Sequence, residues 1–315
     1  MFFSSLYIAG AAHRSQYRPC QDRTAAFSRC YGDVRATVLL VSDGHGHPTH
    51  FRSERGAALA LDAAREALEP FMAKAGHSAA EDISEALFRE LFADILRRWY
   101  SKILTDWKNN PPLEPGINPP ALAYGCTLIG AVAYPGGWFA FQLGDGAAVG
   151  LGAAGMLEEP VPGDLRCMGS LTTSLCSNGA EDFRYCAGNA APAVLMLCSD
   201  GLENCYGSRA ELAGDFLLDV ACGIASDGAE ATICRLQTLL PDFSAAGSRD
   251  DMGLAFWYDS ARAPQAIAAA AAQRLRQLEG ELASRGDADD DEAEYMRERI
   301  EALREITGYK AEEGE

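Results

Sequence analysis

The sequence contains no long uninterrupted apolar segment. No window of 18 or more apolar residues occurs among its 315 residues, so a transmembrane helix is not expected. The first 14 residues carry no basic stretch ahead of their short apolar run, which argues against a signal peptide. The ten cysteines include no Cys-x-x-Cys pair, and without an export signal we expect them to be reduced. These absences together predict a cytoplasmic protein without disulfides and without a membrane partner.

Positive charge is also scarce. The chain has 27 Lys and Arg against 45 Asp and Glu, which gives a formal net charge of −18. Such a surface repels phosphate backbones, so nucleic acid is not an expected partner. The hydrophobic fraction of 48% and the charged fraction of 23% are typical of globular proteins. The length is sufficient for one large domain, or for one domain with an appendage.

Several common catalytic signatures are missing. No cysteine is followed six residues later by arginine, which excludes a cysteine-based phosphatase loop. The sequence has neither a Gly-x-Ser-x-Gly elbow nor a Gly-x-x-x-x-Gly-Lys-Ser/Thr loop. The five histidines form no His-x-x-x-His or His-Glu-x-x-His pair, so a histidine-based zinc site is not expected.

What the sequence does contain is a series of separate runs of strands and helices. Apolar patterning predicts strands at residues 5–13, 24–30, 36–42, 125–134, 138–143, 147–151, 183–186, 193–198 and 253–258. It predicts helices at residues 54–68, 81–107, 208–222 and 230–240. Residues 109–120 contain five prolines and are expected to form a loop. Segregated runs of this kind indicate an α+β fold with antiparallel sheets covered by helices.

The composition changes after residue 260. Residues 263–285 and 292–306 have helical patterns, and the acidic segment Gly-Asp-Ala-Asp-Asp-Asp separates them at 286–291. We therefore expect a main domain at 1–260 and a helical hairpin at 261–315. The pattern leaves open whether the hairpin packs on the domain or dimerises as a short coiled coil.

Aspartates recur where predicted strands end. Asp43, Asp145 and Asp200 are each followed by glycine after a strand, while Asp22 lies beside a turn and Asp250 precedes the last strand. One Asp-Gly pair alone is more typical of a hairpin turn. Five such positions suggest one edge lined with acids, and clustered carboxylates raise each other's pKa unless a cation neutralises them. All-oxygen sites of this kind suit Mg²⁺ or Mn²⁺.

Five blocks of sequence carry a family resemblance. In order, they are Cys20-Gln21-Asp22, Asp43-Gly44-His45-Gly46, Gly125-Cys126-Thr127 leading to Gly144-Asp145-Gly146, Ser199-Asp200-Gly201-Leu202, and Ser248-Arg249-Asp250-Asp251-Met252. The chain in this respect resembles the metal-dependent protein phosphatase 2C family of serine/threonine phosphatases, in its bacterial branch. The resemblance covers about residues 5–258. It implies a β-sandwich of two antiparallel sheets flanked by helices in four layers, αββα, with the metals in a cleft at one end.

The resemblance also implies ligands for two Mg²⁺ or Mn²⁺ ions. Asp43 would bridge them, Asp200 and Asp250 would complete the first site, and the Gly44 carbonyl would serve the second. A water held between two such ions becomes hydroxide-like near neutral pH and can attack phosphorus in line.

Three further positions match the family's pattern. Asp22 corresponds to an acid near the N-terminus, and Asp145 to an acid that helps to bind a third ion in bacterial members. His45 corresponds to the proposed general acid, which would protonate the leaving alkoxide. A histidine that merely caps a turn is the alternative for His45.

Three positions depart from the pattern. Gln21 replaces the usual glutamate, and its amide oxygen is a weaker metal ligand than a carboxylate. The arginine that usually grips phosphate is replaced by Tyr17, which leaves Arg18 and Arg14 as candidates; a solvated surface arginine is the alternative. Asp251 replaces the usual asparagine and is expected to lie behind Asp250.

The expected function is therefore Mg²⁺- or Mn²⁺-dependent hydrolysis of phosphoserine and phosphothreonine in proteins. The partners would be phosphorylated proteins and a cognate serine/threonine kinase. Two alternatives remain open from the sequence. One is a catalytically weak or inactive scaffold that binds phosphoproteins, which Gln21 and the displaced arginine motivate; the other is hydrolysis of small phosphoesters.

Overall fold

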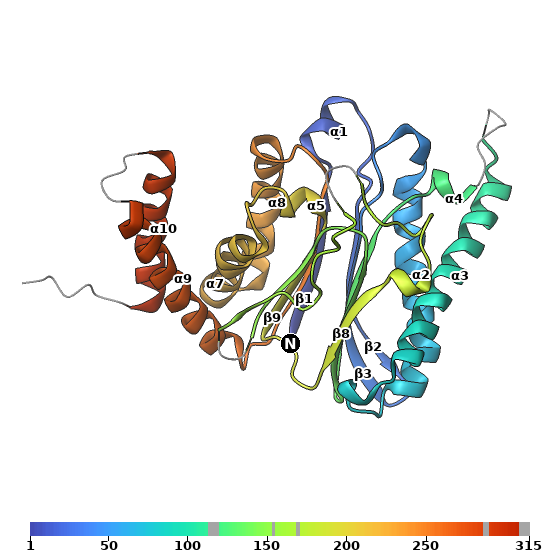
Figure 1. Cartoon of the computed structure of the whole chain (residues 1–315), viewed down its shortest axis with the longest axis horizontal. Helices are drawn as coiled ribbons and strands as arrows, with labels where there is room; N and C mark the ends of the chain where they lie inside the picture. Colours follow the sequence, from blue (N-terminus) through green and yellow to red (C-terminus); the bar gives the residue numbers. More distant parts are fainter. Residues whose placement is uncertain (113–119, 153–154, 168–170, 286–289, 309–315) are drawn as a thin grey trace, which may run out of the picture.

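The computed structural model describes residues 1–112, 120–152, 155–167, 171–285 and 290–308. Two five-stranded antiparallel sheets face each other, and helices cover both outer faces (Figure 1). This arrangement confirms the predicted α+β fold with a β-sandwich flanked by helices. Residues 113–119 of the predicted proline-rich loop and residues 286–289 of the predicted acidic linker lie outside the described residues.

One sheet brings the two ends of the main domain together. Its strand order is β1-β10-β9-β6-β7, and the whole length of β1 pairs with β10. The strands are β1 (Phe2–Ile8), β6 (Ala147–Leu151), β7 (Leu157–Glu158), β9 (Val194–Cys198) and β10 (Met252–Tyr258). β9 and β10 are buried along their entire length, as expected for strands in the middle of a covered sheet.

The other sheet has the order β2-β3-β4-β5-β8. Its strands are β2 (Arg23–Tyr31), β3 (Val34–Ser42), β4 (Leu128–Tyr134), β5 (Gly137–Leu143) and β8 (Arg184–Gly188). A hydrophobic core cluster lies between the two sheets and includes Leu39, Val41, Trp138 and Trp257. Trp138 and Trp257 meet edge to face, with their ring centroids 6.2 Å apart.

The first predicted strand is wrong at its C-terminal end. The prediction continued it through residue 13, whereas β1 ends at Ile8 and residues Ala11–Ser15 form a short helix, α1. The cause is contact with distant residues: the backbone N–H of Gly10 donates to Asp251 Oδ1 (2.7 Å), and that of Ala12 donates to the Arg249 carbonyl (2.9 Å). These contacts turn the chain away from the sheet.

Two long helices cover the β2–β8 sheet. They are α2 (Ser53–Ala75) and α3 (Glu85–Asn109), and the Ser84 hydroxyl caps α3 by accepting from the Leu87 N–H. The apolar residues that recur every three or four positions in α3 are buried against this sheet and α2, as expected for a helix that packs on a sheet. They are Phe88, Leu91, Phe92, Ile95, Trp99 and Ile103.

The opposite sheet is covered by helices from the C-terminal half. The predicted helix at 208–222 is a short helix, α6 (Arg209–Glu211), a π-helical segment, η4 (Leu212–Leu217), and α7 (Leu218–Asp227). α8 (Ala229–Ala246) follows. These helices share a core cluster with β6, β9 and β10.

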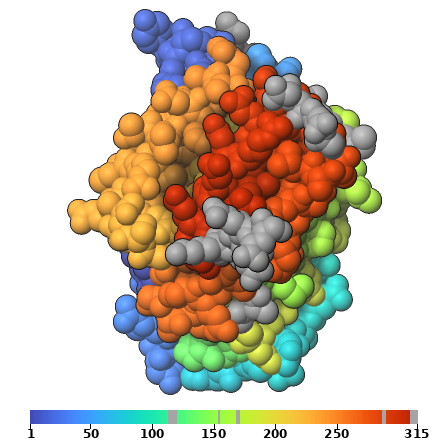
Figure 2. All heavy atoms as spheres, turned by 90° about the vertical axis from the view of Figure 1, so that its left-hand side faces the viewer, coloured from blue at the N-terminus to red at the C-terminus, as the bar shows by residue number. Residues whose placement is uncertain are grey.

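The C-terminal hairpin packs on this helical layer. It consists of α9 (Ala263–Arg285) and α10 (Asp291–Thr307), and Figure 2 shows both spread over one face of the molecule in orange and red. Arg274 and Arg299 are buried, and both pair with Asp215 of the π-helical segment. The sequence left open whether the hairpin packs on the domain or dimerises as a coiled coil, and in the structure it packs on the domain. The division at residue 260 stays a prediction.

No helix in the described part of the chain is long and apolar enough to cross a membrane.

Candidate functional site

Four acids that are far apart in the sequence line one cleft. Asp43, Asp145, Asp200 and Asp250 all border a cavity of about 570 Å³, together with His45. The cleft lies at the end of the sandwich where β3 and β9 end and where the short helix α5 (Asp200–Glu203) begins. The structure therefore brings together most of the acids singled out in the sequence.

Asp43 and Gly44 are held rigidly against the next strand. The Asp43 N–H donates to Thr127 Oγ1 (3.1 Å), and the Thr127 N–H donates to the Asp43 carbonyl (2.8 Å). A side chain at Gly44 would place its Cβ 2.8 Å from the Ser53 carbonyl carbon and 2.9 Å from the Gln21 carbonyl oxygen. Because both neighbours are backbone atoms, only glycine fits beside Asp43, and this explains the Asp-Gly pair sterically.

Asp22 lies beneath the cleft and is completely buried. Its Oδ2 accepts a hydrogen bond from Ser199 Oγ (2.6 Å), while its Oδ1 has no hydrogen-bond partner among the described residues. Burial raises the pKa of Asp22 well above its ordinary value, and the charges of Asp251 and Asp200 raise it further. A buried carboxylate oxygen without a partner is costly unless a ligand satisfies it.

The two central acids behave in the same way. Burial raises the pKa of Asp43, and the charges of Asp22 and Asp200 add to the shift. Burial raises the pKa of Asp200 to about 6. Carboxyls crowded in this way cannot all ionise without a counter-charge. These carboxylate oxygens, including the Asp22 Oδ1 that has no hydrogen-bond partner, therefore fit a hard divalent cation such as Mg²⁺ or Mn²⁺.

The turn that carries Asp145 is shaped by glycines and a buried amide. Gly144 and Gly146 have φ values of 105° and 82°, which residues with a side chain rarely adopt. The fully buried Gln142 points its Nε2 at the carbonyls of Gly144 (3.3 Å), Asp145 (2.9 Å) and Gly146 (2.9 Å). One side chain thus holds all three carbonyls of the turn.

Two arginines hold the same turn from outside. Arg184 Nη2 donates to the Gly144 carbonyl (2.7 Å), and Arg209 Nη2 donates to the Gly146 carbonyl (2.8 Å). Arg209 also pairs with Glu203, at the end of the helix that begins with Asp200 (2.6 Å). The turns that carry Asp145 and Asp200 are therefore linked through one guanidinium.

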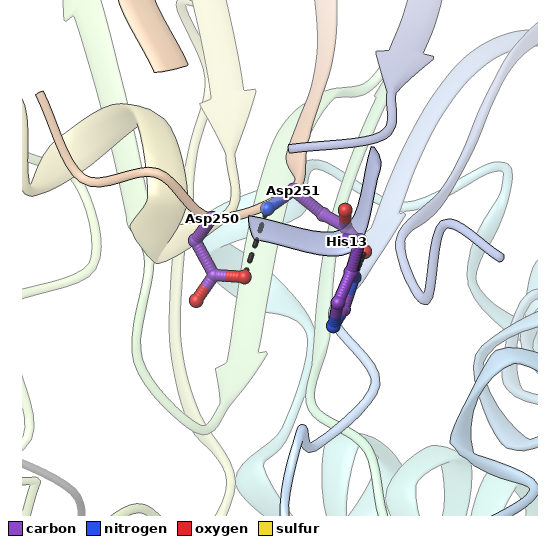
Figure 3. A group of neighbouring side chains, drawn as sticks. All are labelled: His13, Asp250 and Asp251. Atoms are coloured by element: carbon purple, nitrogen blue, oxygen red, sulfur yellow. Dashed lines mark hydrogen bonds and ion pairs between the residues drawn. The ribbon is translucent and has the colours of Figure 1, made fainter. Parts of the chain in front are cut away.

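Asp251 lies behind Asp250, as expected, and anchors the N-terminal segment. Its carboxylate accepts from the backbone N–H of Gly10 (2.7 Å), the backbone N–H of Gln21 (2.6 Å) and His13 Nδ1 (2.8 Å). Figure 3 shows His13, Asp250 and Asp251, with the bond from the Asp251 N–H to Asp250 Oδ1 (2.8 Å). Donors occupy the Asp251 oxygens, so Asp250 is the acid of this pair that faces the cleft.

His45 lies on the wall of the cleft. Its backbone N–H donates to the Gly125 carbonyl (3.1 Å), and its ring Nε2 is 2.7 Å from Ser174 Oγ. The His50 ring meets it edge on, with centroids 4.9 Å apart. Burial lowers the pKa of His45 to about 4, and the nearby His50 contributes to the shift. Without other charges in the cleft, the imidazole is therefore neutral at physiological pH.

Gln21 has a fixed orientation at the edge of the cleft. Its Nε2 donates to the buried Ser53 hydroxyl (2.6 Å). The amide oxygen lies on the Gly46 side, 3.7 Å from where a Cβ on that glycine would be. The hydrogen bond to Ser53 thus leaves the oxygen of the amide available as a neutral ligand.

The two candidate phosphate-binding arginines do not line the cleft. Arg14 Nη2 donates to the Pro241 carbonyl in α8 (2.9 Å), and Arg18 is exposed beyond the end of α1. Tyr17, between them, has a φ of 56° and is 98% exposed. A role of Arg14 or Arg18 in holding phosphate stays a prediction.

Sequence reasoning missed the residues that support the site. Three side chains donate hydrogen bonds to backbone carbonyls of the turn around Asp145 and do not themselves line up as metal ligands: Gln142, Arg184 and Arg209. No local spacing in the sequence marks them. The segment Thr172–Ser174 was also missed, although three consecutive hydroxyl residues in a polar loop are a visible signal. The structure places all of these residues next to Asp145 or His45.

Comparisons with known proteins bear on the family and the fold. The sequence profile of the protein phosphatase 2C family matches residues 9–235. A bacterial serine phosphatase has a similar structure, with a TM-score of 0.53 and 16% identity over 81% of this chain and 96% of that chain. Serine/threonine phosphatase Stp1 from Staphylococcus aureus has a TM-score of 0.51 and 16% identity, over 81% of this chain and 93% of that chain. The S. agalactiae serine/threonine phosphatase has a TM-score of 0.50 and 17% identity, over 82% and 98%. None of the curated protein sequences gives a significant match.

Proposed function

Because this chain belongs to the protein phosphatase 2C family, we propose that it is a divalent-metal-dependent phosphatase that hydrolyses phosphoserine and phosphothreonine in proteins. The observation that carries the proposal is the group of buried carboxyls formed by Asp22, Asp43 and Asp200. Their raised pKa values and the unpartnered Asp22 oxygen call for cations at this position.

The proposed ligands follow from the family pattern and the cleft. Asp43, Asp200, Asp250 and the Gly44 carbonyl would hold two ions, with Asp22 and the Gln21 amide oxygen beside them. Asp145 would help to hold a third. When bound, Mg²⁺ or Mn²⁺ ions offset the negative charge of the phosphoryl oxygens and lower the pKa of water.

His45 is the proposed general acid. Its ring borders the cleft that contains the acids, and one of its two nitrogens is already fixed by Ser174. A serine or threonine alkoxide is a poor leaving group, so a proton delivered to its oxygen accelerates the reaction by about 10²–10⁴-fold. The exposed Arg18, and Arg14 with it, are the proposed contacts to the substrate, and phosphorylated products of a serine/threonine kinase are the proposed partners.

The first experiment measures hydrolysis of a phosphoserine peptide with Mn²⁺, with EDTA and with vanadate. We expect turnover with Mn²⁺, none with EDTA, and little inhibition by vanadate. Asp43→Asn and Asp200→Asn should each lower kcat by about 10²-fold or more, since each removes charge that holds the ions. Asp33→Asn is the matched control, because Asp33 is highly exposed and pairs only with the exposed His77 among the described residues. Full activity of both cleft variants would refute the proposal.

A second function is favoured by one observation. Gln21 contributes no charge to the site, so the second ion would be held weakly and the protein would bind phosphoproteins without turning them over. Calorimetric titration with Mn²⁺ separates the two functions. Two or more tight sites favour the phosphatase, and one weak site favours the binding module.

A further inference from the structure

Three consecutive hydroxyl side chains reach the two sides of the cleft. Thr172 borders the cleft together with Asp145, and Thr173 Oγ1 accepts from the Gly144 N–H (2.9 Å). Ser174 Oγ lies 2.7 Å from His45 Nε2. Thr173 and Ser174 are 6% and 3% exposed, so this segment is built into the molecule rather than lying on its surface.

The direction of the bond between His45 and Ser174 follows from the other contacts of the serine. Ser174 Oγ is 3.1 Å from the Cys126 carbonyl, which can only accept. The Ser174 hydroxyl has one proton. Because it donates this proton to the Cys126 carbonyl, its oxygen must accept a hydrogen bond from His45 Nε2. The Cys176 thiol is also near, at 3.2 Å, but sulfur is a weak acceptor and does not compete with the carbonyl. His45 Nε2 therefore carries a hydrogen.

The Cys126 carbonyl is itself part of the frame of the site. Cys126 forms an isolated bridge with Gly44, next to Asp43, and its carbonyl also accepts from the Leu175 N–H (3.0 Å). The Ser174 hydroxyl is thus oriented by backbone atoms that are themselves fixed to the acidic turn. No hydrogen bond to His45 Nδ1 is found within the described ranges, so Nδ1 is the nitrogen available to a substrate.

We propose that Ser174 is a positioning residue for His45: it keeps a hydrogen on Nε2 and leaves Nδ1 to deliver the proton to the leaving group. The proposal rests on the proposed phosphatase function. In the step concerned, the oxygen of water bonds to phosphorus as the bond from phosphorus to the serine or threonine oxygen breaks. The imidazole enters this step with a second proton, on Nδ1. The electron pair of the broken bond goes to the leaving oxygen, which takes that proton and leaves the ring neutral with its hydrogen on Nε2. The proton released by the water returns to Nδ1 through solvent, and the hydrogen on Nε2 stays bonded to Nε2 and hydrogen bonded to Ser174 Oγ throughout.

The test uses two substrates that differ in leaving group. p-Nitrophenolate is a good leaving group and needs no proton, whereas a serine alkoxide must be protonated as it leaves. Loss of a positioned acid should therefore slow hydrolysis of the phosphoserine peptide and not that of p-nitrophenyl phosphate. Ser174→Ala should lower kcat on a phosphoserine peptide by about tenfold or more, with KM within about twofold. On p-nitrophenyl phosphate the same variant should change kcat by less than about twofold. Ser174→Thr keeps a hydroxyl and should restore most of the peptide activity.

A cycle with His45 tests whether the serine acts through the histidine. His45→Gln should show the same leaving-group pattern with a larger loss. Adding Ser174→Ala to His45→Gln should then cause no further loss, because the group that the serine positions is gone. Ser101→Ala is the control, since Ser101 is an exposed hydroxyl in the middle of α3 and should change neither substrate.

A readout independent of turnover is the tautomer of His45 in EDTA. Imidazole ¹⁵N spectra of the wild type should show the hydrogen on Nε2, and those of Ser174→Ala should show a mixture or the Nδ1 form. Ser174→Cys provides the same comparison if the alanine variant is unfolded. Equal losses on both substrates, or an unchanged tautomer, would overturn the proposal. If the wild type hydrolyses neither substrate, the proposed phosphatase function has failed, and the spectra still decide the role of Ser174.

Discussion

Gln21 Nε2 donates a hydrogen bond to Ser53 Oγ across 2.6 Å, and Ser53 is the completely buried first residue of α2. A glutamate in the same place would present a charge to the cleft, and the serine hydroxyl would turn round to donate to it. The chain therefore already has the partner that a carboxylate at this position requires.

The first prediction concerns this pair. Gln21→Glu should tighten Mn²⁺ binding by about tenfold, or about 1.4 kcal/mol, because a carboxylate is a stronger ligand than an amide. Calorimetric titration measures the effect. Gln21→Glu combined with Ser53→Ala is the control and should recover only part of the gain. Unchanged affinity in Gln21→Glu would mean that residue 21 does not face an ion.

The second prediction concerns pH and stability without metal. The pKa of Asp200 is raised to about 6 in the folded protein, above about 3.9 for an unfolded aspartate. The folded state thus binds more protons between these values, so its stability is greatest at low pH and falls as the pH rises through about 6. In EDTA, we expect Tm at about pH 5 to exceed Tm at about pH 7.

Two controls accompany this pH series. Saturating Mn²⁺ should abolish the difference, since bound cations favour the ionised carboxylates. Asp200→Asn should reduce the difference in EDTA because it removes one of the titrating groups. A Tm in EDTA that rises with pH across this window would contradict the crowding of acids in the cleft.

The third prediction concerns Gly125, which lies under two imidazoles. A Cβ at this position would lie 2.4 Å from His50 Nδ1 and 2.8 Å from His45 Cδ2, so an alanine must displace both rings. Gly125→Ala should lower kcat on a phosphoserine peptide by about tenfold or more, since small displacements of an acid are costly. Gly280→Ala in α9 is the control, because no atom lies within 4 Å of its added Cβ. Equal activity of the two variants would exclude a role for the ring positions.

The fourth prediction concerns the hairpin. Arg274 is 4% exposed and makes two bonds to Asp215, from Nε to Oδ1 (3.1 Å) and from Nη2 to Oδ2 (2.9 Å). Arg274→Ala removes one of the two arginines paired with the buried Asp215, while Arg299 remains, and should cost about 1.5–3 kcal/mol in the free energy of unfolding. Arg276→Ala, on the exposed side of the same helix, should cost less than about 0.5 kcal/mol. Urea unfolding compares the two, and a small effect at Arg274 would indicate a loosely attached hairpin.

The strand pattern was sufficient to predict antiparallel sheets covered by helices and acids along one edge, whereas the sandwich itself was implied by the family resemblance. Each acid follows or precedes a buried strand, and strand periodicity is a local property that the sequence records directly. The acids at 43, 145, 200 and 250 therefore met as expected. The ends of elements were less predictable: β4 begins at Leu128 rather than at residue 125, because Cys126 pairs with Gly44.

The supporting residues could not be found in this way. Ser174 reaches His45 across 129 positions of sequence, and Gly10 reaches Asp251 across 241. Such pairs depend on how the sheets and loops meet in space, and they leave no period in the sequence. The same holds for α1, where contacts with Arg249 and Asp251 override the local preference for a strand.

The pairing of β1 with β10 also has a consequence for how the protein is made. Every residue of β1 pairs with β10, and β1 has no other strand neighbour in its sheet. During synthesis, the first strand must therefore remain without its partner until about 250 residues later in the chain, when Met252–Tyr258 has emerged. Contacts of such long range slow folding and expose apolar edges in the meantime. Because Asp250 and Asp251 immediately precede β10, the cleft cannot be complete before this segment has been synthesised.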